Sequence, residues 1–480
     1  MKKLFVIFLT TVLFFALAGA QTEQKPQLPA DDSGKPPAKG HKITPEETKE
    51  LFQQVDEILR FASERTLLPI KHPVKKSMVN RAAVEKYIED KFKDDVERIR
   101  FERSELVLKK FGMLPRTFDL HTFLVKLLGE QVAGYYDEET KTMNLLDWVE
   151  MEMQRPVMAH ELTHALQDQS FDLGKLTKKN EAIEKRGPED PNALIKIDEE
   201  SGCRSAVMEG QAMIVFLDYV LAPAGHTVED SPKFVDLMLT QMDKSEDSPL
   251  LASAPLLIKE ELVFPYSHGM KFIATLLASG GKKLAYTGVL ERMPLTTREV
   301  MEPQEYLAGH RVPQILLPDM DFLKKDFDAF DAGVMGELDV DILLKQYANA
   351  EVAGRLSPEW RGGSYYAAGR KGAKPAGPGS TSHIGLLYVS KWSNEKAAAE
   401  FAKVYASSLP QRYSKLEHMP ATGNASRDQY TSSDGLIILE QHGDLLVITE
   451  SFDEPTANKL ISAALKQTQP TAQGTSSPAY

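Results

Sequence analysis

Residues 160–164 read His160-Glu161-Leu162-Thr163-His164, and this H-E-x-x-H stretch is the most informative feature of the chain. On an α-helix, residues four apart lie about 40° apart around the axis, so both imidazoles point the same way and can share one metal ion. Glu161 follows the first histidine, where its carboxylate can reach a water molecule at an open metal position. Two histidine ligands and a neighbouring carboxylate base are typical of a zinc hydrolase. The alternative is a buried helix with two structural histidines.

Catalytic zinc usually has three protein ligands, so a third ligand is expected elsewhere. Residues 165–170 offer no third histidine at the H-E-x-x-H-x-x-G-x-x-H spacing, but residues 197–222 lack proline and predict a second helix. Glu209 lies on this helix among small residues, which would let two helices approach closely, whereas Glu200 points to the opposite face. We therefore predict Glu209 as the third ligand; the alternative is an ordinary charge at a helix surface. The other residues on the Glu209 face are Gly202, Ser205, Ala206, Ala212 and Met213.

Residues 159–169 (AHELTHALQDQ), followed by 209–212 (EGQA), resemble exported bacterial zinc metalloproteases of the gluzincin (thermolysin-like) superfamily. Further similarity lies at residues 131–137 and 360–363, so the resemblance covers most of residues 44–465. It implies a mainly helical zincin-type domain that binds Zn²⁺ and hydrolyses peptide bonds with Glu161 as general base. One departure is Glu302-Pro303, where a His-Pro pair is expected.

Residues 131–146 have the alternating apolar and polar pattern of a β-hairpin, which ends shortly before the H-E-x-x-H helix. In gluzincins an edge strand at this place binds the substrate by strand addition, and the resemblance implies that role for Gly134, Tyr135 and Tyr136. An unpaired strand edge offers N–H and C=O groups to any extended peptide. The alternative is a plain core hairpin.

Gluzincins also commonly use a tyrosine or histidine to stabilise the oxyanion of the transition state. The polar candidates in and just beyond residues 260–307 are Tyr266, His268, Tyr306 and His310. No spacing rule selects among these four residues. Each one, taken alone, is also compatible with a structural role.

The N-terminus has the features of a secretory signal peptide. Lys2 and Lys3 precede an apolar run that ends at Ala18-Gly19-Ala20, which predicts cleavage after Ala20 and a secreted or periplasmic protein. The run is short for a membrane anchor, and no later segment is expected to cross a bilayer. The net charge of −12 and the absence of a basic stripe argue against nucleic-acid binding. A single cysteine, Cys203, excludes an internal disulfide.

The chain divides by composition and periodicity into five parts. After the signal peptide (1–20), residues 21–43 predict a disordered linker and residues 468–480 a disordered tail. Residues 44–318 form the expected metalloprotease domain, in which Thr44-Pro45-Glu46-Glu47 starts a helix, 77–111 is helical and 175–192 is a long loop or flap. Residues 319–467 predict a small α+β domain with strands at 385–392, 435–440 and 445–450. The expected fold class is therefore α+β.

Together these features predict a secreted or periplasmic zinc metallopeptidase that acts on peptides or proteins. Two alternatives stay open at this point: an exported zinc-binding scaffold without turnover, and a zinc amidase that acts on a non-peptide or cell-wall substrate. An intact Glu161 argues against the scaffold, because holding zinc requires no base. The sequence does not identify the peptide that is cut.

Overall fold

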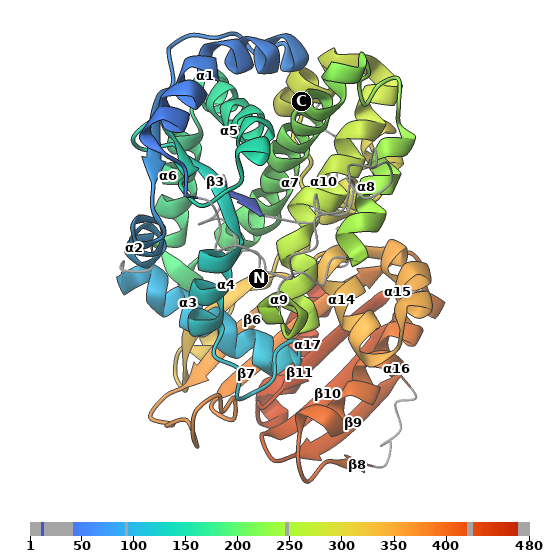
Figure 1. Ribbon diagram of the computed structural model, residues 1–480. Coiled ribbons are helices and arrows are strands. Elements are labelled where there is room, and N and C mark those ends of the chain that lie inside the picture. Colours follow the sequence, from blue (N-terminus) through green and yellow to red (C-terminus); the bar gives the residue numbers. More distant parts are fainter. Residues whose placement is uncertain (1–10, 14–41, 92–94, 245–248, 420–425, 469–480) are drawn as a thin grey trace, which may run out of the picture.

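The computed structural model describes residues 11–13, 42–91, 95–244, 249–419 and 426–468. Its upper part in Figure 1 is mainly helical with a small sheet, and its lower part is a large sheet accompanied by helices. The predicted α+β class is confirmed. The predicted signal peptide (apart from residues 11–13), the linker up to residue 41 and the tail after residue 468 lie outside the described residues.

The helical part runs to α13 along the chain. Its helices are α1 (Pro45–Thr66), α2 (Arg81–Lys91), α3 (Asp95–Phe111), α4 (Leu120–Gln131), α5 (Met151–Phe171), α6 (Leu173–Glu184), α7 (Pro191–Leu221), α8 (Lys233–Lys244), α9 (Pro249–Ala252), α10 (Leu256–Lys282), α11 (Val289–Glu291), α12 (Thr297–Met301) and α13 (Pro303–Leu307). A π-helical turn, Lys283–Gly288, follows α10. The strands are β1 (Thr11–Leu13), β2 (Lys75–Val79), β3 (Val132–Asp137) and β4 (Thr142–Leu146).

The start of α1 is the predicted one. The hydroxyl of Thr44 accepts a hydrogen bond from the backbone N–H of Glu47 at 3.2 Å, and the Glu47 carboxylate accepts one from the Thr44 N–H at 2.8 Å. Pro45 occupies the first turn, where its missing N–H costs nothing. This reciprocal capping fixes the helix that packs on α5.

The small sheet has the strand order β1-β3-β4-β2. β3 and β4 form the predicted antiparallel hairpin, with Gly134 opposite Leu145, and β2 adds in parallel to β4. On the other edge of β3, Thr11–Leu13 pairs antiparallel, with Val12 opposite Gly134. An extended piece of chain therefore occupies the edge of β3 opposite to β4.

Two expectations about the helical part are wrong. Residues 77–111 are not one helical stretch, because residues 75–79 form β2 and the rest divides into α2 and α3. Most of the expected loop at 175–192 belongs to α6, whose Leu, Lys, Glu and Ala residues favour a helix. The turn-forming residues begin only at Gly187, and α7 starts as early as Pro191.

The lower part of the molecule contains one seven-stranded sheet of order β5-β6-β7-β11-β10-β9-β8, in which all neighbours are antiparallel. The predicted strands at 385–392, 435–440 and 445–450 correspond to β7, β10 and β11. The elements are β5 (Phe327–Val334), α14 (Glu337–Tyr347), α15 (Ala350–Leu356), β6 (Trp360–Arg370), β7 (Ile384–Trp392), α16 (Glu395–Arg412), β8 (Glu417–Met419), β9 (Arg427–Ser432), β10 (Gly435–His442), β11 (Leu445–Glu450) and α17 (Glu454–Thr468).

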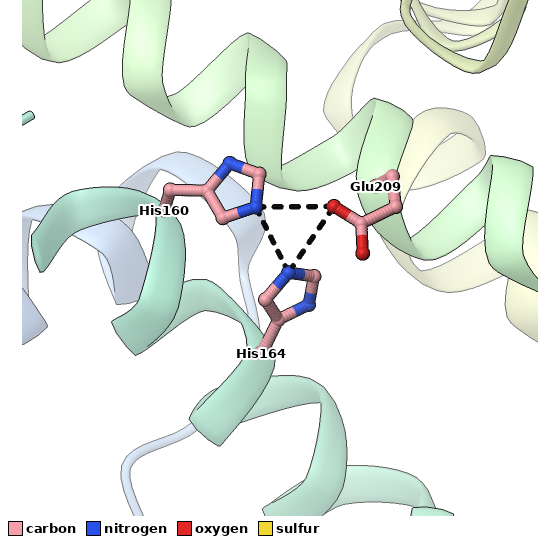
Figure 2. A group of neighbouring side chains, drawn as sticks. All are labelled: His160, His164 and Glu209. Carbon is pink, nitrogen blue, oxygen red and sulfur yellow. Dashed lines mark hydrogen bonds and ion pairs between the residues drawn. The ribbon is translucent and has the colours of Figure 1, made fainter. Parts of the chain in front are cut away.

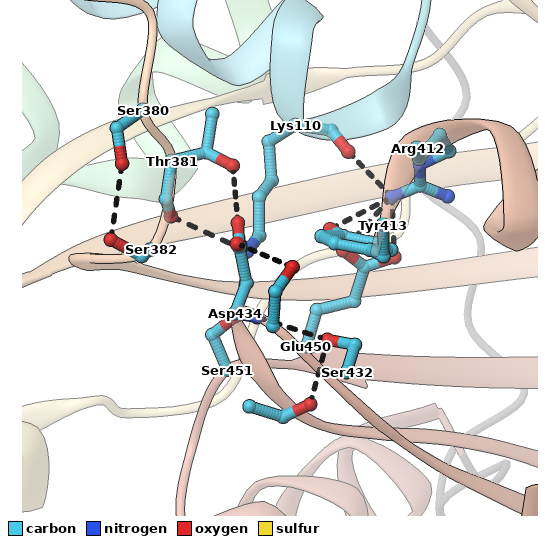
Figure 3. Close-up of polar contacts among 12 residues, drawn as sticks. Lys110, Ser380, Thr381, Ser382, Arg412, Tyr413, Ser432, Asp434, Glu450 and Ser451 are labelled. Atoms are coloured by element: carbon cyan, nitrogen blue, oxygen red, sulfur yellow. Dashed lines mark hydrogen bonds and ion pairs between the residues drawn. The ribbon is translucent and has the colours of Figure 1, made fainter. Parts of the chain in front are cut away.

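Buried charges join α3 to this sheet (Figure 3). The ammonium group of Lys110 donates to Ser451 Oγ at 2.6 Å, while Arg412 donates to both carboxylate oxygens of Glu450 at 2.6 and 2.9 Å. Burial lowers the pKa of Lys110 to about 8, although the carboxylates of Glu450 and Asp434 oppose that effect. Because removing one partner of a buried pair leaves the other charge uncompensated, this network fixes how α3 sits on the sheet.

α7 runs between α5 and α10 at the centre of the helical part (Figure 1). Contrary to expectation, residues 191–224 are long and apolar enough to cross a membrane by length and composition, yet 78% of their most apolar window is buried inside the protein. The N-terminal half of α7 is held by β5 of the large sheet and by the start of α12. Asp198 accepts the N–H of Val334 at 2.8 Å, and Glu199 accepts the N–H of Thr297 at 3.1 Å. α7 is thus built as a core helix.

The crossing of α7 and α10 depends on glycine. A Cβ atom on Gly269 would lie 2.1 Å from the carbonyl oxygen of Ala206, and one on Gly210 would lie 2.3 Å from the carbonyl oxygen of Gly269. Ala206 was expected to serve the approach of the two helices that carry His160, His164 and Glu209. It lies instead at the crossing with α10, where its carbonyl oxygen faces Gly269.

We expect Gly269→Ala to destabilise the protein by about 3 kcal/mol or more, because the new methyl group meets backbone that cannot move without separating the helices. The matched control is Gly354→Ala on α15, where a Cβ would meet nothing within 4 Å. The free energy of unfolding of both variants, from chemical denaturation, checks this. Equal stabilities would show that the close crossing is not required.

Candidate metal centre

α5 presents both histidines of the H-E-x-x-H motif on one face, and α7 brings Glu209 opposite them (Figure 2). The Nε2 atoms of His160 and His164 lie 3.0 Å apart. Oε2 of Glu209 lies 3.1 Å from Nε2 of His160 and 3.5 Å from Nε2 of His164. All three side chains are buried, and their polar atoms converge on one point.

These three residues could hold a metal ion. Their ligand atoms all lie within 4.8 Å of one another, and no other such group of three or more occurs in the described part of the chain. Around a tetrahedral ion with bonds of about 2.0–2.2 Å, neighbouring ligand atoms lie about 3.3–3.6 Å apart, close to the observed separations. Oε1 of Glu209 is buried and has no hydrogen-bond partner among the described residues, although buried polar atoms normally have one. The residues therefore fit a metal.

The same geometry perturbs the pKa values of the two histidines in opposite directions. Burial lowers the pKa of His160 to about 4, with only partial opposition from its hydrogen bond to Glu209. Burial acts in the same sense on His164, but the Glu209 carboxylate, the charge of Glu161 and the hydrogen bond to Gln167 together outweigh it and raise the pKa to about 9. Burial favours the protonated form of Glu209 as well, yet the charge of His164 and the two histidine contacts lower its pKa. Without metal, near neutral pH, His164 is an imidazolium paired with the Glu209 carboxylate.

Metal uptake is therefore expected to release about one proton at pH 6, because His164 must lose its Nε2 proton to become a ligand. For a group whose pKa is about 9 in the metal-free protein, the apparent affinity falls about tenfold per pH unit as the pH drops below that value. Isothermal titration of zinc into the protein in two buffers with different heats of ionisation measures the proton count. Uptake without proton release would contradict the assigned charge state.

Glu161 is buried beside the three ligands and is not one of them. Its negative charge is among the causes that raise the pKa of His164 and of Tyr266, which places it close to both. A Cβ atom on Gly134 would lie 3.5 Å from Cγ of Glu161 and 2.7 Å from the Val157 side chain. β3 thus passes directly over this part of α5, and glycine is needed for the approach.

Of the four candidate oxyanion stabilisers, the structure places Tyr266 in the electrostatic environment of the site. Its buried hydroxyl has a pKa raised by burial first and then by the charges of Glu209 and Glu161. Its position follows from the α7–α10 crossing, because Gly269 lies one turn further along α10.

The other three candidates make contacts elsewhere. The ring of His268 stacks on Phe264, with ring centroids 5.2 Å apart. The hydroxyl of Tyr306 donates to the carbonyl oxygen of Arg292 at 2.7 Å. His310 is exposed and lies 3.3 Å from Glu305. None of these contacts involves the ligands or Glu161.

The predicted substrate strand, Gly134-Tyr135-Tyr136, lies in β3. Its tyrosine side chains are engaged in the core, since Tyr135 stacks on Tyr87 and the Tyr136 hydroxyl donates to Asp168 at 2.8 Å. What remains for a second strand is the backbone of β3 along one edge, and residues Thr11–Leu13 pair with that edge.

Sequence reasoning missed two buried glutamines behind the ligands. Gln167 contacts His164, and Gln211 contacts Gln167 in turn. For Gln167 the sequence offers a signal, because it lies three residues after His164 on the same helix and therefore on a neighbouring position of its surface. Gln211 is two residues after Glu209, and that spacing predicts no contact.

No protein-family model, curated protein or solved structure matches this chain.

Proposed function

We propose that this protein is an exported zinc-dependent metallopeptidase with the zincin type of site. The observation that carries the proposal is the convergence of His160, His164 and Glu209 on one buried point, with Glu161 beside them. Two imidazoles and one carboxylate suit zinc better than calcium or magnesium, which prefer oxygen ligands only. Three protein ligands leave a fourth position for water, which is the arrangement of catalytic rather than structural zinc.

When bound, zinc would lower the pKa of a water molecule and polarise the scissile carbonyl. Glu161 takes the proton from this water as its oxygen bonds to the carbonyl carbon, and gives the proton to the leaving nitrogen as the C–N bond breaks. Tyr266 is the candidate donor to the developing oxyanion, because a buried tyrosine with a raised pKa keeps its proton. The buried surroundings of these groups strengthen each of these interactions.

A peptide substrate is favoured by the edge of β3. This edge accepts an extended strand in antiparallel orientation, as its pairing with Thr11–Leu13 illustrates. Strand addition binds the peptide backbone and leaves side-chain preference to the surrounding surface. Gly134, in the middle of this strand, lets β3 itself lie close to Glu161.

The proposal is tested by incubating the purified chain that begins at Gln21 with a peptide library and identifying products by mass spectrometry. We expect cleavage that a zinc chelator abolishes and added zinc restores. Cleavage that persists without metal, or a zinc-loaded protein that cuts no peptide, would contradict it. In the second case, release of product from cell-wall amides would favour the amidase alternative.

A further inference from the structure

A chain of hydrogen bonds leads from one metal ligand into the core. Nδ1 of His164 lies 2.9 Å from Oε1 of Gln167. The amide nitrogen of Gln167 donates to the carbonyl oxygen of Met208 at 3.1 Å and to Oε1 of Gln211 at 2.8 Å. The amide nitrogen of Gln211 donates to the carbonyl oxygens of Ala285 and Tyr286 at 2.8 and 3.2 Å. Both glutamines are fully buried.

This series of hydrogen bonds allows only one orientation of each glutamine amide. Backbone carbonyls can only accept, so the nitrogen of Gln211 must face Ala285 and Tyr286, and its oxygen must face Gln167. The nitrogen of Gln167 then faces Gln211 and Met208, which leaves its oxygen toward His164. An amide oxygen only accepts, so Nδ1 of His164 carries a hydrogen. Its Nε2 atom is the one that faces His160 and Glu209.

We propose that Gln167 and Gln211 are positioning residues of the metal site. Together they keep the hydrogen of His164 on Nδ1, so that Nε2 is the nitrogen that gives up its proton and binds the metal, and they anchor His164 to the π-helical turn after α10. This inference rests on the proposed metal site and names residues that act through His164. Outer-shell partners of metal-binding histidines typically contribute about 10–100-fold to metal affinity.

The two histidines differ in this respect. Nδ1 of His160 has no hydrogen-bond partner among the described residues, whereas Nδ1 of His164 is fixed by Gln167. The hydrogen bonds from His164 onward also join three elements, since Gln167 lies on α5, Gln211 on α7 and the accepting carbonyl groups in the Lys283–Gly288 turn. His164 is therefore the ligand that the fold orients in advance.

The test measures zinc affinity by competition with a chromophoric chelator. We expect Gln167→Met to weaken zinc binding about 10–100-fold. Gln211→Met should weaken it less, because Met208 still orients the Gln167 amide. In the Gln167→Met background, Gln211→Met should have no further effect on affinity, since the chain is already broken.

The matched control is Gln154→Met. Gln154 is an equally buried glutamine on α5, and its amide donates only to the carbonyl oxygens of Leu146 and Val149. The Gln154→Met variant should be less stable than the wild type but should bind zinc with the same affinity. Unchanged affinity in Gln167→Met, or additive losses in the double variant, would overturn the positioning role while leaving the proposed function intact.

Nitrogen-15 NMR of the histidine rings in the zinc-loaded wild type tests the same point without any variant. We expect Nδ1 of His164 to be protonated and Nε2 to be bound to metal. A reversed assignment would overturn the positioning role, whereas a wild-type protein that takes up no zinc would overturn the metal site itself.

Discussion

Replacing Glu161 with glutamine is expected to reduce peptide hydrolysis by about 10²–10⁴-fold and to leave metal content unchanged. Glutamine has the size of glutamate, so the buried space beside Gly134 stays filled. The amide, however, cannot accept a proton from the attacking water. Glu161 is not among the three residues whose atoms converge, so its replacement removes no ligand. Initial rates on the best peptide of the library, together with zinc content, measure both effects.

The control for this variant is Glu152→Gln, an exposed glutamate in the first turn of the same helix. It should retain wild-type rates and zinc content. If Glu161→Gln also retained wild-type turnover, the general-base role would be wrong. If it lost zinc together with activity, Glu161 would be a ligand or a support of the site.

Replacing Glu209 with alanine should weaken zinc binding by more than about 100-fold, because outer-shell partners alone are worth about 10–100-fold and we propose Glu209 as a direct ligand. Glu200→Ala is the matched control on the same helix. Its carboxylate is 38% exposed and lies 3.5 Å from Arg204, away from the histidines. Zinc retained after dialysis against a mild chelator, measured with both variants, separates the two glutamates. Equal retention in both variants would place the third ligand elsewhere.

Helical periodicity was enough to predict the grouping of the three ligand residues. The spacing of four between His160 and His164 determines a shared face, and helical phase distinguishes Glu209 from Glu200. The structure brings the three predicted residues together from two helices, although His164 and Glu209 are 45 residues apart in the sequence. Likewise, the hairpin before α5 and the strands of the large sheet followed from alternation and turn residues.

Features that depend on tertiary contact were not predictable in this way. The hydrogen bond from Gln211 to the carbonyl oxygen of Ala285 joins residues 74 positions apart, and helical or strand periodicity does not predict a contact of that range. The prediction for Ala206 named the wrong neighbouring helix, because a small residue indicates that another helix approaches without indicating which one. The polar composition of residues 175–192 led to the prediction of a loop. Leu, Lys, Glu and Ala favour a helix, however, and form most of α6.

The central claim is that His160, His164 and Glu209 hold one catalytic zinc ion. The most direct measurement is the metal content of the purified mature chain by mass spectrometry, beside a His160→Ala/His164→Ala double variant whose fold is checked by circular dichroism. The account predicts one zinc ion per wild-type chain and none in the folded double variant. A folded wild-type protein that takes up no zinc, or a double variant that keeps it, would contradict the account.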